Sequence, residues 1–188
     1  MRHRYPRTAQ DLRIRMNPEP SYRIVVAALL RQADQILLVK QQGPSDPAPS
    51  WGLPGGVVKA DEPLGEALRR EISEETGLQL LELGRVLYAA QAREYKSGRR
   101  TTSFIFEAKG WQGEIAPADP DDLILDARFL PLETAIKALE TLPWSVMREP
   151  AVAYLQGQTS PGALWLYRIQ QDGQTCLVER IQGWEAEA

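Results

Sequence analysis

The sequence has a single cysteine and a single histidine among its 188 residues. Cys176 by itself forms neither an internal disulfide nor a multi-cysteine zinc site, and a lone cysteine is more typical of packing than of catalysis. His3 lies in a polar N-terminal stretch, so neither a Ser-His-Asp nor a Cys-His mechanism has its residues available. The chemistry of this chain therefore has to come from other side chains.

Long apolar runs and a strong charge of either sign are also absent. The longest apolar run, residues 24–30, is far shorter than the roughly 20 residues that cross a bilayer, and no apolar stretch follows the N-terminal arginines as it would in a secretory signal. The formal net charge is −3, which provides no basic field for a nucleic-acid polymer. We therefore expect a one-domain cytoplasmic protein with neither a membrane nor a nucleic-acid partner.

A charged stretch lies in the middle of the chain at residues 70–75, with the sequence Arg-Glu-Ile-Ser-Glu-Glu. On a helix Glu71, Glu74 and Glu75 share one face, at i, i+3 and i+4. Like charges at this spacing repel one another, so a compensating positive group is expected, and an oxygen-seeking dication such as Mg²⁺ suits carboxylates. The alternative interpretation is a solvated acidic face that binds nothing.

The helical wheel favours the metal over the solvated face. Its apolar stripe consists of Leu64, Leu68 and Ile72. Glu71 and Glu75 lie on either side of this stripe, so we expect them to project toward the protein body, where a charged group needs a partner. Arg70 falls on the opposite, solvent side of the wheel.

The ends of this helix are also marked in the sequence. Residues 53–56 read Leu-Pro-Gly-Gly, a tight turn in which consecutive glycines allow a close backbone approach. Asp61 or Glu62 is expected either to cap the helix start or to complement its dipole, and Pro63 suits the first turn. Gly77 is well placed just past the helix C-terminus.

The stretch from Gly56 to Leu78 resembles the Nudix box, Gly-x5-Glu-x7-Arg-Glu-U-x-Glu-Glu-x-Gly-U, in which U is a bulky aliphatic residue. All defined positions are filled, by Gly56, Glu62, Arg70, Glu71, Ile72, Glu74, Glu75, Gly77 and Leu78. The resemblance implies an α/β fold, an α/β/α sandwich with a central mixed sheet. It also implies divalent-metal-dependent hydrolysis of a nucleoside diphosphate linked to another group.

The same resemblance implies roles for individual residues. The glutamates Glu71, Glu74 and Glu75 would hold Mg²⁺, which Mn²⁺ could replace, and one of them or a loop carboxylate would act as general base. Arg70 would orient a glutamate, and Glu62 would support the site or add a ligand.

Two loops could complete the site. Gly55 and Gly56 would let the backbone approach the substrate. A later loop carries Asp121 and Asp122, either of which could supply the further carboxylate that some Nudix-like proteins place there.

A basic turn is predicted between two strands after the box. Arg93, Tyr95, Arg99 and Arg100 lie at or beside its tip, together with Lys96. Arginine forks match phosphate oxygens, so these residues are candidates for binding substrate phosphate or ribose. The alternative is a solvated hairpin tip.

The chain divides into three parts on this interpretation. Residues 1–20 form an N-terminal arm in which apolar and arginine residues alternate, as in a short edge strand. Residues 21–157 form the Nudix domain, with a second helix over 132–142 and a short helical turn over 150–156. Residues 158–188 form a C-terminal hairpin around Asp172-Gly173 and a tail. The hairpin covers a sheet edge or a partner subunit, and a homodimer stays open.

The predicted function is metal-dependent hydrolysis of a pyrophosphate linkage in a nucleotide. Nucleotide sugars, nucleoside triphosphates and dinucleoside polyphosphates all stay open as substrates. An ADP-ribose-like substrate is less favoured, because this chain has no proline at residues 91–95, where enzymes resembling ADP-ribose hydrolases tend to carry one. The rival interpretation is a catalytically silent Nudix-fold sensor that binds nucleotides. An unbroken box favours the enzyme.

Overall fold

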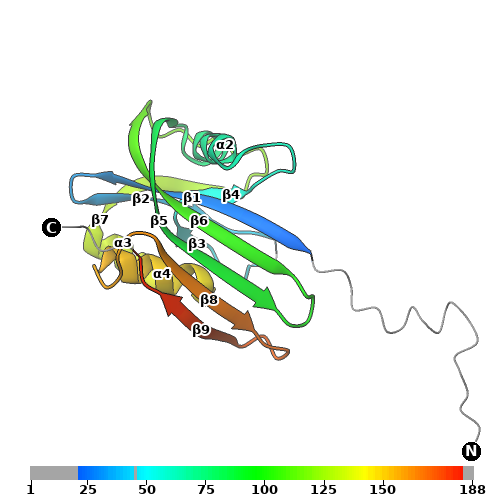
Figure 1. Ribbon diagram of the computed structural model, residues 1–188. Helices are drawn as coiled ribbons and strands as arrows, with labels where there is room; N and C mark the ends of the chain where they lie inside the picture. The colour runs from blue at the N-terminus through cyan, green and yellow to red at the C-terminus, as the bar shows by residue number, and fades with distance from the viewer. Residues whose placement is uncertain (1–20, 45, 184–188) are drawn as a thin grey trace, which may run out of the picture.

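Segments of alternating apolar residues pair into one mixed sheet of nine strands within the described part of the chain, residues 21–44 and 46–183 of the computed structural model (Figure 1). The strands are β1 (Tyr22–Gln32), β2 (Gln35–Gln41), β3 (Ser50–Gly52), β4 (Gly55–Val57), β5 (Gln79–Glu94), β6 (Arg100–Gln112), β7 (Ile124–Pro131), β8 (Ala163–Ile169) and β9 (Thr175–Ile181). Their order is β3-β2-β1-β6-β5-β8-β9, with β4 paired to β1 and β7 paired to β2.

The sheet is mixed because two of its central pairings are parallel. β1 runs parallel to β6, and β5 runs parallel to β8. β5 and β6 themselves form a long antiparallel hairpin from Gln79 opposite Gln112 to Arg93 opposite Arg100. The predicted basic turn therefore joins the two strands at the centre of the sheet.

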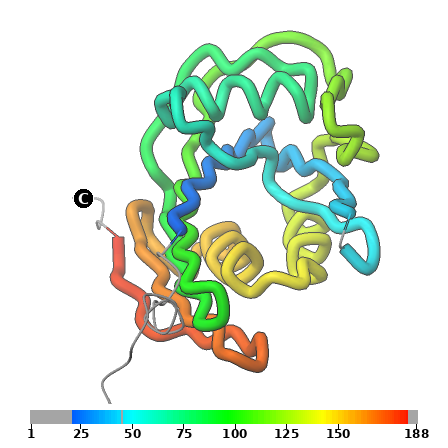
Figure 2. The backbone as a smooth tube through the Cα atoms, turned by 90° about the vertical axis from the view of Figure 1, so that its right-hand side faces the viewer, coloured from blue at the N-terminus to red at the C-terminus, as the bar shows by residue number. Residues whose placement is uncertain are grey.

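Helices cover both faces of the sheet. One face carries α2 (Leu64–Thr76), and the other carries α3 (Leu132–Glu140) and α4 (Ser145–Leu155). Figure 2 shows the first strand lying between these two helical layers. Each layer encloses its own apolar core, one built around Leu68 and Ile72 and the other around Tyr88 and Leu139. This arrangement confirms the α/β/α sandwich. None of the helices in residues 21–44 and 46–183 has the length and apolarity needed to cross a membrane.

One helix is longer than the sequence predicts. The expected short turn over residues 150–156 is the second half of α4, which begins at Ser145 and contains Pro150 in its interior. Proline removes one helical hydrogen bond, but Pro150, Ala151 and Ala153 are buried against the sheet. Their packing stabilises the helix at a position where the low helix propensity of proline would otherwise end it.

The C-terminal hairpin belongs to the same sheet as the rest of the domain. β8 and β9 are antiparallel around Gly173, whose φ of 88° suits a tight turn. Trp165 and Tyr167 on β8 are buried in the core beneath α4. The boundary proposed at residue 157 therefore does not separate two packing units, because residues on both sides of it share one core. The predicted N-terminal arm, residues 1–20, lies outside the described residues.

Candidate active site

Helix α2 is held by its buried face and by a glycine stop. Leu68 and Ile72 are fully buried against the sheet. Gly77 takes the left-handed conformation with a φ of 77°, and its N–H donates to the Ser73 carbonyl, as predicted. The expected cap by Asp61 or Glu62 is wrong, because no side chain caps the helix.

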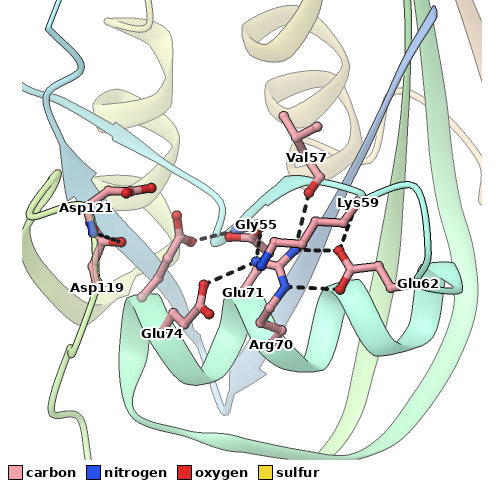
Figure 3. Close-up of polar contacts among 10 residues, drawn as sticks. Gly55, Val57, Lys59, Glu62, Arg70, Glu71, Glu74, Asp119 and Asp121 are labelled. Atoms are coloured by element: carbon pink, nitrogen blue, oxygen red, sulfur yellow. Dashed lines mark hydrogen bonds and ion pairs between the residues drawn. The ribbon is translucent and has the colours of Figure 1, made fainter.

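Glu62 instead pairs with Arg70 from the loop before the helix. The Arg70 guanidinium donates to both Glu62 carboxylate oxygens at 2.6 and 3.0 Å, and the backbone N–H of Lys59 donates to the same carboxylate at 2.8 Å (Figure 3). These hydrogen bonds, led by the one from Arg70, lower the pKa of Glu62 to about 2. Glu62 thus stays charged at all ordinary pH values.

Arg70 is the cation of this site. Besides Glu62 it donates to Glu71 at 2.7 Å, to Glu74 at 3.1 Å and to the Val57 carbonyl at 3.3 Å (Figure 3). Its predicted position on the solvent side of the helix is wrong: the side chain is only 21% exposed. A long side chain can fold back along its helix, and three carboxylates attract it there.

Glu75 has a different environment on the same helix. It is only 6% exposed, and it accepts one hydrogen bond, from the Gly55 N–H at 2.7 Å. Burial, the largest cause, and the charges of Glu71 and Asp119 together raise its pKa to about 8, against the lowering effect of that hydrogen bond. Burial also raises the pKa of Glu71. Among the described residues no Lys or Arg forms an ion pair with Glu75.

Two glycines shape the approach to these carboxylates. Gly55 has a φ of 150°, and a Cβ there would lie 2.1 Å from the Val26 carbonyl oxygen. A Cβ on Gly56 would lie 2.5 Å from the Glu71 carboxylate. At Gly55 the clash is with backbone, so only glycine fits there beside β1, whereas at Gly56 a side chain would displace the Glu71 carboxylate.

The donor set fits a hard divalent cation. Glu71, Glu74 and Glu75 each use one carboxylate oxygen in a hydrogen bond, and within residues 21–44 and 46–183 the other oxygen of each accepts none. Hard cations such as Mg²⁺ take carboxylate oxygens and water as ligands. The described side chains do not already converge into a cluster of three or more ligands, so the fit rests on the chemistry and burial of these groups.

A further carboxylate, Asp119, was missed by the sequence analysis. Its two oxygens accept from the backbone N–H groups of Asp121, Leu123 and Ile124. The same loop is tied to the end of α2, since the Ala118 N–H donates to the Glu74 carbonyl at 2.9 Å. An aspartate that precedes a proline and two acidic residues is a typical turn-forming signal, and this was the available hint.

The predicted aspartates lie in the same loop with their side chains exposed. Asp121 and Asp122 are both exposed, and Asp122 has a φ of 53°. Asp119, not either of these, carries the charge that acts on Glu75. A role for Asp121 or Asp122 stays a prediction.

The basic hairpin tip lies away from the carboxylates. Arg100 is level with Tyr22 on β1, whereas Gly56 is level with Val26, a separation of four residues or about 13 Å along the strand. Arg100 also stacks on the exposed Tyr22 ring at 5.6 Å and donates to its hydroxyl at 3.2 Å. Tyr95 at the tip is exposed.

The register places further arginines beside Arg100. Arg93 lies directly opposite Arg100, and Arg168 on β8 is level with Arg93. Like charges opposite one another in a sheet repel. None of these three arginines is ion-paired with a carboxylate among the described residues, so the row has positive charge available for an anion.

An apolar pocket opens on the other side of β1. It encloses about 430 Å³, its mouth included, between the sheet and the helices α3 and α4. Val25 and Ala27 of β1 line it, as do Leu53, Tyr88 and Met147. Ala27 is also the partner of Gly55 in the β1–β4 pairing. One strand thus separates this pocket from the glycine turn that contacts Glu75.

The chain also matches a known protein family. The family model of the NUDIX domain matches residues 21–149, more than half of the chain. The chain belongs to the Nudix family.

Individual relatives agree with this assignment. Nudix hydrolase 6 of Arabidopsis thaliana is 27% identical over 132 residues, which are 69% of this chain and 44% of that protein. The CTP pyrophosphohydrolase of Escherichia coli K12 is 42% identical over 55 residues, 29% of this chain and 41% of that protein. The chain thus spans less than half the length of these curated relatives. A MutT NUDIX hydrolase structure from Burkholderia pseudomallei matches with a TM-score of 0.54 and 28% identity, covering 72% of this chain and 98% of that one.

Proposed function

We propose that this Nudix chain hydrolyses a pyrophosphate linkage in a nucleotide, using a divalent metal ion, Mg²⁺ or Mn²⁺, bound at Glu71, Glu74 and Glu75. The observation that carries the proposal is the state of Glu75. It is a buried carboxylate next to a second acidic group, and it lacks an ion pair with any described cation. Such a group is costly to keep charged, and a dication removes that cost.

The protein's own residues divide the work of holding the ion. Arg70 fixes the orientation of Glu71 and Glu74 through one oxygen of each, and the Gly55 N–H fixes Glu75. The remaining carboxylate oxygens are the proposed ligands. When bound, the ion would neutralise the phosphates and lower the pKa of the attacking water. A carboxylate of the same group, or Asp119, would take the proton from that water.

The apolar pocket is the proposed site for the nucleoside. Its lining is apolar apart from the hydroxyls of Ser103 and Tyr88, which is the character expected of a surface that takes a base. It lies one strand away from the glycine turn, so a nucleotide seated there can direct its phosphates toward the α2 carboxylates. The arginines at the hairpin tip are the proposed contacts for the outer part of the substrate.

A nucleoside triphosphate is the substrate class that we favour. The E. coli relative with 42% identity in its matched segment is named a CTP pyrophosphohydrolase. The products of this reaction would be a nucleoside monophosphate and pyrophosphate. Nucleotide sugars and dinucleoside polyphosphates are the alternatives that the experiment must include.

The test is an initial-rate assay on a panel of these nucleotides with Mg²⁺ and with EDTA. We expect metal-dependent release of pyrophosphate or phosphate, fastest with a nucleoside triphosphate. Glu66→Gln is a matched control, because Glu66 lies on the exposed side of the same helix. Nucleotide binding without turnover on the whole panel would favour the silent sensor and overturn the proposal.

A further inference from the structure

A second cleft lies at the far end of the sheet, beyond the apolar pocket. It has a volume of about 670 Å³ and lies between the C-terminal ends of β1 and β6, the middle of β5 and the C-terminal end of α4 with the residues that follow it. Leu29 of β1 lines it, two residues past Ala27 of the apolar pocket. The two cavities share no lining residue, although Tyr88 of the pocket and Tyr154 of the cleft are in ring contact at 5.9 Å.

Positive charge is concentrated in this cleft. Arg31, Lys109 and Arg85 come from the three neighbouring strands β1, β6 and β5, and all three line it, against one carboxylate, Glu107. Three positive charges and one negative charge leave a formal balance of +2 in a chain whose net charge is −3. An anion is the ligand that such a lining attracts.

The ion pairs in the cleft are loose and leave the cations available. Arg85 lies 3.6 Å from Glu107 and Lys109 lies 3.8 Å from Glu82, and both cations are more than half exposed. Pairs of this kind contribute little to stability. Arg31 donates only to the carbonyl of Ala33 in its own turn among the contacts of residues 21–44 and 46–183.

Two hydroxyl groups add hydrogen-bonding capacity. The half-buried Tyr154 projects from α4 and lines the cleft together with Arg85 and Arg31. Burial raises the pKa of its hydroxyl, against the opposing effect of the two arginines. Thr159 lines the same cleft with a side chain that is only 9% exposed, and in the described part of the chain its hydroxyl has no hydrogen-bond partner. Buried polar groups are normally paired, so this hydroxyl has unused capacity.

The helix end does not block an anion here. The C-terminus of a helix carries partial negative charge, but the last carbonyls of α4 are already engaged. Those of Tyr154 and Ala153 accept from the N–H groups of Gly157 and Gln158. The cations on the strands therefore dominate the cleft.

We propose that this cleft is a second, non-catalytic binding site for a multiply charged phosphate anion. Three cations that approach from different strands suit a group with several charged oxygens. Arginine forks in particular match phosphate oxygens. The shared chemistry is a phosphate or pyrophosphate group, either free or carried by a nucleotide.

The test is calorimetric titration of the full chain with inorganic pyrophosphate in EDTA, with orthophosphate and AMP as further arms. Without divalent ions the acidic α2 site repels these anions. Trp111 lines the cleft, so its fluorescence provides a second readout. We expect saturable binding that weakens about tenfold or more in Arg31→Gln/Arg85→Gln, as for the loss of two charge-assisted contacts, and severalfold in Tyr154→Phe.

The matched control is Arg23→Gln/Arg69→Gln, which removes the same charge from two exposed positions outside the cleft. It should bind pyrophosphate within about twofold of the wild type. Pyrophosphate and AMP binding equally tightly would assign the site to the phosphate group alone, whereas preference for AMP would assign it to a nucleotide. No saturable binding, or unchanged affinity in Arg31→Gln/Arg85→Gln, would overturn the proposal. If that variant does not fold, Tyr154→Phe/Lys109→Gln makes the same test.

Discussion

Two carboxylates of the same site, Glu62 and Glu75, have opposite environments. Glu62 lies against Arg70, which lowers its pKa to about 2, and burial raises the pKa of Glu75 to about 8. The protein supplies a cation to one end of the acidic cluster and leaves the other end without a described ion pair. The contrast is the basis of the proposal that the Arg70 end of the cluster is structural and that the Glu75 end binds a metal ion.

The largest expected effect is on turnover at the uncompensated end. Glu75→Gln and Glu74→Gln keep the side-chain shape but remove a proposed metal ligand. Metal charge stabilisation contributes several kcal/mol, and about 1.4 kcal/mol corresponds to tenfold in rate, so kcat should fall by about 100-fold or more. Measuring kcat at saturating Mg²⁺ together with the melting temperature checks this.

The outcome for folding separates the two roles of Glu75. The metal-free Glu75→Gln variant should melt at or above the wild-type temperature, because folding at neutral pH no longer requires Glu75 to take up a proton or to be buried with a charge. A collapsed melting temperature would instead make Glu75 a structural residue, and near-normal kcat in both variants would remove the pair from the site.

At the Arg70 end of the cluster, the expected effect of a substitution is on the stability of the protein. Arg70→Gln leaves Glu62, Glu71 and Glu74 without their shared donor, and the three neighbouring carboxylates then repel one another without a compensating cation. We expect a lower urea midpoint for the metal-free protein. Adding Glu62→Gln to this variant should restore part of the decrease, and a wild-type midpoint in Arg70→Gln would contradict the contrast.

The sequence predicts one side of this contrast better than the other. The box spacing and the helical wheel place Glu75 inward, since both depend on residues within one helix. The wheel misplaces Arg70, because its partner Glu62 lies eight residues earlier in a loop whose path the wheel does not contain. Asp119 and the Arg93–Arg100–Arg168 row depend on loop docking and on the parallel β5–β8 register, which no local pattern specifies.

A pH series of the metal-free protein should show the effect of Glu75. A carboxyl group whose pKa is about 8 when folded and near 4.5 when unfolded binds more protons in the folded state between these values. The contribution of Glu75 to stability should therefore be largest below about pH 4.5 and fall as the pH rises to 8, at up to about 1.4 kcal/mol per pH unit. Glu75→Gln should flatten the fall in urea midpoints, and an equal fall in that variant would assign it to other groups.

The smallest expected effect is at the basic tip, which contacts neither end of the cluster. Replacing Arg99 and Arg100 with Ala should raise KM severalfold and leave kcat nearly unchanged, as expected for lost uniform binding. Initial rates across substrate concentrations measure the split. A lower kcat at constant KM would show that the tip acts on the chemical step.

The most direct test of the account is Mn²⁺ binding, followed by electron paramagnetic resonance, to the wild type, Glu75→Gln and Glu66→Gln. Mn²⁺ accepts the same oxygen ligands as Mg²⁺ and is itself observable, so no substrate is needed. The account predicts saturable binding in the wild type and Glu66→Gln, and affinity weakened about tenfold or more in Glu75→Gln. Equal Mn²⁺ affinity in all three proteins would contradict the proposal that a metal ion binds Glu75 and compensates its negative charge.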